Sequence, residues 1–221
     1  MSTRGDERRI GPDSLPPAPA ERERLTIDVS LLPEAVFGHR GVTWWATTAF
    51  MLIEGTTLVL MLASYLYLRL NSAEWPPRPG SDPNLLWPTV NLLLILGKCV
   101  PFYLASKAAK RLDSPGVRKW MAVGVLLGFV ALAIRALEFQ SLNIHWNENA
   151  YGSVVWGIMV VHTLLMVTDV LESVAIAAIF WKRKEEPKHY PDVEDDAMYE
   201  YFLATTWVVL YAFVFLSPRV F

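Results

Sequence analysis

Long apolar stretches alternate along the chain with short segments that are polar, basic or rich in proline. A helix needs roughly 20 mostly apolar residues to cross the hydrocarbon core of a bilayer. The pattern therefore predicts an all-α integral membrane protein, a bundle of five transmembrane helices. The predicted spans are about Val42–Leu68, Leu85–Ser106, Val117–Leu142, Tyr151–Trp181 and Tyr199–Leu216.

The polar segments divide the chain and predict how it lies in the membrane. Residues 1–40 form a charged, proline-rich tail, and we expect Met1–Arg24 to be disordered because it has little apolar surface to bury. Residues 41–221 form the membrane domain. The tail and the loops after the second and fourth spans hold fifteen of the 20 Lys and Arg residues, and the opposite side holds three. The positive-inside rule then predicts a cytoplasmic N-terminus and a C-terminus outside the cytoplasm.

Composition narrows the functional classes. Apolar residues make up 53% of the chain and the net charge is only −2, so nothing indicates a nucleic-acid partner. The single cysteine, Cys99, lies in an apolar run and is interpreted as a small buried residue. Only His162 of the four histidines lies inside a span, whereas a haem with two axial histidines needs two facing ones. We therefore expect no redox metal centre in this chain.

Ionisable residues at membrane depth are the candidate functional residues, because each costs roughly 2.5–3.5 kcal/mol to insert near the bilayer centre. Glu54 and His162 lie at matching depths, and we expect them to meet. Two readings are open. The pair exchanges protons or lines a lipid cleft, or it is a hydrogen-bonded pair that fixes helix packing.

Two further groups have similar alternatives. Arg135 and Glu138 are three residues apart and share a helix face, as an ion pair or as a binding site for a lipid headgroup. Lys98 lies at a depth similar to that of Asp169 and Glu172, which predicts a structural ion pair or a lysine that extends to the interface. Elsewhere, Gly124 and Gly128 form a GxxxG step, which predicts the close approach of a neighbouring helix.

Several segments together resemble subunit III of the cytochrome c oxidase family over about residues 30–216. The first is the helix WWATTAFMLIEGTTLVLMLASYLYLR, in which Glu54 falls on the family's mid-span glutamate. The others, in the family's order, are WPP at 75–77, TVNLLLIL at 89–96, RALEF at 135–139, YGS at 151–153 and YEYFLATTWVVLY at 199–211.

The resemblance implies a non-catalytic subunit of a haem–copper terminal oxidase in a bacterial inner membrane. It implies contact with oxidase subunit I and association with subunit II. These partner subunits, and not this chain, would hold the haem and copper. It also implies bound phospholipid, support of proton uptake, and cleft and packing roles for Glu54, Glu138 and His162. A subunit III-like component of a quinol oxidase or nitric oxide reductase is the nearest alternative. A small transporter lined by Glu54, His162, Lys98 and Asp169 is a weaker one, because the chain shows no internal repeat.

Overall fold

A computed structural model describes residues 35–77, 83–182 and 186–220 of the 221. These described residues belong to one compact unit. The predicted disorder of Met1–Arg24 lies outside the described residues.

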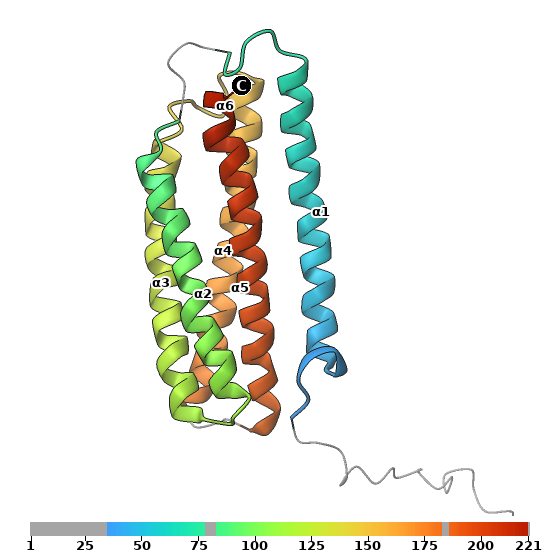
Figure 1. The fold of residues 1–221 in the computed structure, drawn as a ribbon, viewed down its shortest axis with the longest axis vertical. Coiled ribbons are helices and arrows are strands. Elements are labelled where there is room, and N and C mark those ends of the chain that lie inside the picture. Colours follow the sequence, from blue (N-terminus) through green and yellow to red (C-terminus); the bar gives the residue numbers. More distant parts are fainter. Residues whose placement is uncertain (1–34, 78–82, 183–185, 221) are drawn as a thin grey trace, which may run out of the picture. The chain divides into compact units, whose positions relative to one another are not determined.

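Five long helices make up almost all of the described chain (Figure 1). Each is long and apolar enough to cross a membrane, and the described residues contain no strand, so the prediction of an all-α fold with five spans is confirmed. After α5 the chain continues through a π-helical turn, η5, into the short helix α6. Short 3₁₀ turns, η3 and η4, precede α1 and α5. The bounds are η3 Gly38–Arg40, α1 Val42–Leu70, α2 Leu86–Ala109, α3 Ser114–Gln140, α4 Ala150–Trp181, η4 Pro187–His189, α5 Tyr190–Tyr211, η5 Ala212–Leu216 and α6 Ser217–Val220.

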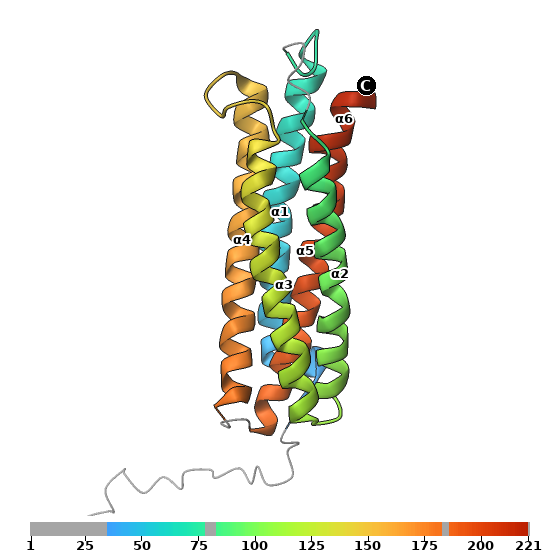
Figure 2. The ribbon, with the colours of Figure 1, turned by 90° about the vertical axis from the view of Figure 1, so that its left-hand side faces the viewer.

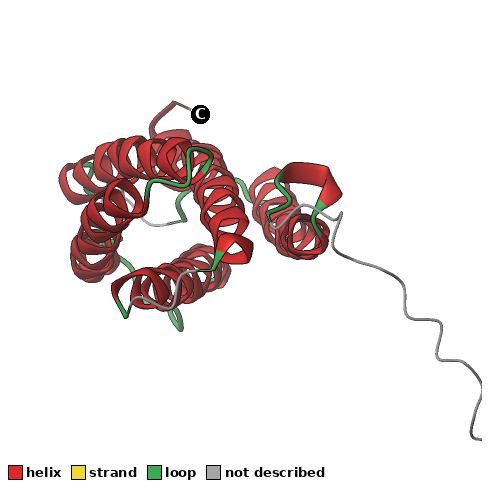
Figure 3. Cartoon of the chain, turned by 90° about the horizontal axis from the view of Figure 1, so that it is seen from below, coloured by secondary structure: helices red, strands yellow, loops and turns green. Residues whose placement is uncertain are grey.

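Four of the helices form a ring. Helix α2 packs against α3, α3 against α4, α4 against α5, and α5 back against α2, which Figure 3 shows in a view along the helices. Helix α1 lies outside this ring and packs on α4 and α5, and Figure 2 shows it behind the other helices. Only Leu58 and Tyr65 of α1 are buried, so most of this helix faces lipid or another protein.

The fifth span begins earlier than the sequence predicts. Helix α5 starts at Tyr190, whereas the apolar pattern places the start near Tyr199. The difference arises because the first turns of α5 are rich in carboxylates, which lower the hydropathy of the segment. Two of these carboxylates, Asp195 and Asp196, are nevertheless buried in the protein. Hydropathy measures affinity for lipid, and it does not detect polar residues that face the inside of a bundle.

Small residues on α3 allow its neighbours to approach closely, as the GxxxG step predicts. A Cβ atom added to Gly124 would lie 2.6 Å from the ring of Phe102 on α2. A Cβ atom added to Gly128 would lie 2.8 Å from a methyl group of Val170 on α4. Both distances are too short for carbon atoms, so any side chain at these positions would push a neighbouring helix or side chain away.

The buried apolar residues form two clusters. One contains Trp207, Tyr151 and Met159, and the other contains Phe102, Met121 and Phe180. Between them along α2, α4 and α5 come three buried charged residues, Lys98, Asp169 and Glu200. The middle of the bundle is therefore polar, and this determines where a functional site can lie.

Candidate functional site

A buried ion pair lies near the end of α3, and a hydrogen bond links it to α2. The guanidinium group of Arg135 lies 2.9 Å from a carboxylate oxygen of Glu138, one turn further along the helix. Asn91 of α2 donates a hydrogen bond of 3.0 Å to the same oxygen. All three side chains are almost completely buried. Of the two readings of Arg135 and Glu138, this geometry favours the local ion pair, because an enclosed guanidinium group cannot reach a lipid headgroup.

Arg135 also determines the state of His162 on α4. A guanidinium nitrogen lies 3.3 Å from Nδ1 of His162, and the guanidinium group stacks over the ring of Trp207, 3.8 Å from its centre. Arginine has only donors, so Nδ1 of the histidine must accept. The proton then sits on Nε2, which lies 3.3 Å from the carbonyl oxygen of Leu203 and donates to it. This hydrogen-bond network assigns His162 as the neutral Nε2–H tautomer. We call Arg135, Glu138, Asn91, His162 and Trp207 the Arg135 network.

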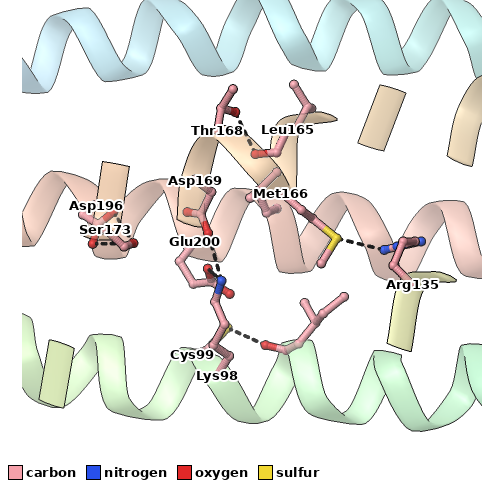
Figure 4. Close-up of polar contacts among 12 residues, drawn as sticks. Lys98, Cys99, Arg135, Leu165, Met166, Thr168, Asp169, Ser173, Asp196 and Glu200 are labelled. Carbon is pink, nitrogen blue, oxygen red and sulfur yellow. Dashed lines mark hydrogen bonds and ion pairs between the residues drawn. The ribbon is translucent and has the colours of Figure 1, made fainter. Parts of the chain in front are cut away.

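A second group of buried charges lies in the middle of the bundle, and Figure 4 shows it between α2, α4 and α5. The ammonium group of Lys98 lies 2.9 Å from Asp169 and 2.6 Å from Glu200. It also lies 5.3 Å from the centre of the Phe102 ring. The structure thus brings the predicted partners Lys98 and Asp169 together and adds Glu200, which sequence reasoning missed.

One turn before Glu200, α5 carries another buried carboxyl group. Asp196 is 1% exposed, and its two carboxyl oxygens lie 2.9 and 3.1 Å from the hydroxyl group of Ser173 on α4 (Figure 4). The spacing of Asp196 and Glu200, four residues apart, places both on one face of α5. We call Lys98, Asp169, Asp196 and Glu200 the Lys98 cluster.

The predicted meeting of Glu54 with His162 is wrong. Glu54 of α1 accepts a hydrogen bond of 2.7 Å from the hydroxyl group of Tyr199 on α5, whereas His162 belongs to the Arg135 network. The prediction rested on matching depths, but depth does not determine the direction in which a helix points a side chain. Helix α1 lies outside the ring, so Glu54 meets the outer face of α5 and does not reach the interior where His162 lies.

Glu54 also lines a pocket of about 470 Å³ between α1, α4 and α5. Three more carboxyl groups line it, those of Glu172, Asp192 and Asp195. The sequence groups Glu172 with Lys98 by depth, and this too is wrong, because Lys98 pairs with other carboxylates and Glu172 faces the pocket. We call this space the acidic pocket. Its remaining lining residues are Thr43, Ala46, Thr47, Phe50, Thr168, Ile176 and Tyr199.

The residues that sequence reasoning missed are mainly on α5. Asp196, Glu200 and Trp207 lie on it, and all are buried. The available signal was the i, i+4 spacing of Asp196 and Glu200 directly before an apolar run. Within the described part of the chain, no three His, Cys, Asp or Glu side chains are arranged so that they could hold a metal ion.

Comparison with known proteins adds the family context. No protein-family model matches the chain. A Synechocystis protein named "Cytochrome c oxidase subunit 3" is 24% identical over 209 residues, which cover 90% of this chain and 88% of that protein. A protein of the same name from Thermostichus vulcanus is 25% identical over 175 residues, 77% of this chain and 85% of that protein. A Mycobacterium bovis protein named "Probable cytochrome c oxidase subunit 3" is 22% identical over 179 residues, 79% of this chain and 85% of that protein. The resemblance seen in the sequence is thereby confirmed, and the chain is a multi-pass membrane homologue of the proteins named cytochrome c oxidase subunit 3.

Proposed function

We propose that the chain is the third, non-catalytic subunit of a haem–copper terminal oxidase and acts in aerobic respiration. The observation that carries the proposal is the length of the similarity. Relatives named cytochrome c oxidase subunit 3 align with 77–90% of this chain and with 85–88% of their own length. Similarity over most of this chain and most of each relative supports the same fold and the same place in an oxidase complex.

The proposal assigns the oxygen chemistry to neighbouring subunits. Haem and copper belong to those partners, with oxidase subunit I in direct contact and subunit II in the same complex. Large apolar side chains on α1 such as Phe50, Leu52 and Ile53 are each more than 60% exposed. Such a surface requires lipid or another membrane protein around it, which fits a subunit that works through its neighbours.

We further propose an N-terminus in the cytoplasm and a C-terminus in the periplasm of a bacterial inner membrane. The excess of Lys and Arg in the tail and in the loops after α2 and α4 supports this orientation. It places the acidic pocket toward the cytoplasmic side, because the pocket is lined by Thr43 at the start of α1 and Asp192 at the start of α5.

The proposed contribution of this subunit is to bind phospholipid, stabilise the complex and support proton uptake. The acidic pocket supports this role, since it joins apolar walls to carboxyl groups that can carry protons. Glu54 is the residue to test, because it lies in the pocket and near the middle of α1.

The first experiment is gentle purification of the tagged chain, followed by identification of its partners and a visible spectrum. We expect oxidase subunits to co-purify, with haem absorbance in the complex and none in the chain once it is separated. Recovery without any oxidase subunit, or haem bound to the separated chain, would contradict the proposal. The identity of the partners also distinguishes a cytochrome c oxidase from a quinol oxidase or a nitric oxide reductase.

The second experiment compares the Glu54→Ala variant with a control variant, Glu74→Ala. Glu74 is an exposed glutamate in the loop after α1. We expect the Glu54 variant to assemble with its redox centres intact but to retain less phospholipid or to inactivate sooner during turnover. The control variant should match the unmodified complex. An assembled Glu54 variant that lost oxygen reduction at once would show a more direct role for this residue.

A further inference from the structure

The Lys98 cluster contains more acidic groups than its single cation can neutralise. Asp169, Asp196 and Glu200 supply three carboxyl groups, and Lys98 supplies one ammonium group. All four side chains are at most 5% exposed. If every group were ionised, a net charge of −2 would remain in the middle of the bundle. Uncompensated charge at such a place is strongly unfavourable, and protonation of the carboxyl groups is the usual way in which proteins remove it.

The geometry around Lys98 indicates where one proton sits. Asp169 and Glu200 both contact the same ammonium nitrogen, so the two carboxyl groups lie beside one cation. Two ionised carboxylates have only acceptors and cannot hydrogen-bond to one another. One proton between them supplies the missing donor and leaves a single negative charge opposite Lys98, as in other sites where two carboxyl groups share a proton.

The surroundings of Asp196 indicate the place of a second proton. Its described hydrogen-bond partner is the hydroxyl group of Ser173, and the charged groups that act on it are Asp169, Glu172 and Glu200, all acidic. No cation among the described residues lies within ion-pair distance of it. A carboxyl group in these surroundings is stable as the neutral acid.

The other elements around the cluster supply no compensating charge. Helix α3 faces it with Gly128, where an added Cβ atom would lie 3.5 Å from the lysine nitrogen. Helix α2 adds the Phe102 ring and the thiol group of Cys99, the residue directly after Lys98, and both are uncharged. Helix α1 lies across the acidic pocket and contributes Glu54, which Tyr199 already binds.

On two helices, a residue that lines the acidic pocket is followed directly by a residue of the cluster. Thr168 of α4 and Tyr199 of α5 line the pocket, and the residues that follow them, Asp169 and Glu200, face the lysine. The acidic pocket is therefore a described space that lies beside the cluster along α4 and α5.

We infer that the Lys98 cluster is an electrically neutral proton store, which holds one proton shared by Asp169 and Glu200 and a second on Asp196, and exchanges them through the acidic pocket. The inference concerns this chain alone and stands whether or not the chain acts in an oxidase.

Infrared spectroscopy of the full chain in lipid nanodiscs at neutral pH tests the inference. The carbonyl band of a protonated carboxyl group is separate from the bands of a carboxylate. We expect the spectrum of the unmodified protein to contain protonated-carboxyl absorbance that shifts in D₂O. Asp196→Asn should remove part of that absorbance and leave the carboxylate bands unchanged. Lys98→Met should increase it, because the cluster then needs one more proton to be neutral.

The matched control is Glu194→Gln on the same helix. Glu194 is partly exposed and pairs with Lys110 at 2.7 Å, so its variant should lose carboxylate bands only. Loss of carboxylate bands in Asp196→Asn would overturn the inference, and so would failure of this variant to fold, since asparagine reproduces the size and hydrogen bonding of the neutral acid. Protonated-carboxyl absorbance that does not shift in D₂O would overturn the proposed exchange.

Discussion

Replacement of Arg135 by Met should leave a buried carboxylate without its cation. Methionine fills most of the space of the arginine stem, so the main loss is electrical. The variant loses the 2.9 Å ion pair to Glu138, the contact with His162 and the stacking on Trp207. Removal of one partner from a buried ion pair typically costs about 3–5 kcal/mol, because the other charge stays buried. We expect the free energy of unfolding to fall by about this amount.

The double variant Arg135→Met/Glu138→Gln separates this cause from a loss of packing. Glutamine at position 138 can still accept the hydrogen bond from Asn91 and carries no charge. The double variant should therefore be more stable than the Arg135→Met variant, although it contains one more substitution. Lys110→Met is the control, because Lys110 is 53% exposed in its pair with Glu194 and such pairs contribute about 0–1 kcal/mol.

Reversible unfolding in mixed micelles of increasing SDS content measures these differences, with helicity as the signal. A loss of 3–5 kcal/mol lowers the folding equilibrium constant by roughly two to almost four powers of ten. If Arg135→Met lost less than about 1 kcal/mol, or if the two substitutions were simply additive, the assignment of a buried, mutually dependent pair would be refuted.

Three further predictions concern packing, hydrogen bonding and pH. Gly128→Ala should destabilise the protein by about 1–3 kcal/mol in the same unfolding assay, because its methyl group would overlap a valine methyl on α4, whereas Gly97→Ala, with open space around it, should be neutral or slightly stabilising. Tyr199→Phe should cost about 0.5–1.5 kcal/mol, and that loss should vanish when Glu54, whose carboxylate the tyrosine binds, is also replaced by Leu, which has no acceptor. Lys188, 2.6 Å from Glu186 in the loop before α5, holds the pKa of that carboxyl group below its ordinary value. This stabilisation is present above the ordinary pKa and is lost as the pH falls through the lowered one, and titration by NMR should find the ordinary value in Lys188→Met.

The number of helices could be predicted from the sequence because the bilayer imposes a strict requirement of length and hydropathy. The structure moves the ends of the first four spans by only a few residues, for example from Leu68 to Leu70 in α1. The start of α5 was placed too late because its first turns are acidic and therefore low in hydropathy. Those acidic residues face a pocket and the bundle interior, so they do not prevent the helix from extending to Tyr190. The sequence reveals which residues are polar, but whether they face lipid or protein depends on neighbours that hydropathy does not describe.

The candidate site could be predicted only where its partners are close in sequence or opposite in charge. Arg135 and Glu138 share a helix, so the 3.6-residue period was sufficient to pair them. Glu54 and His162 lie on different helices, and the rotation of each helix about its own axis is set by packing. Helix α1 turns Glu54 toward Tyr199, a contact between residues 145 positions apart that no local pattern records.

The position of α1 outside the ring has a consequence for biogenesis. This helix leaves the ribosome before the other four, yet both of its packing partners, α4 and α5, are synthesised after α2 and α3. Transmembrane helices insert individually before they associate. The carboxyl group of Glu54 therefore has no hydrogen bond from Tyr199 until α5 has been inserted and packs on α1. During that interval Glu54 is an ionisable side chain exposed to hydrocarbon, which is energetically unfavourable. The insertion of α1 should therefore depend on lipid headgroups or an insertion factor that binds this side chain.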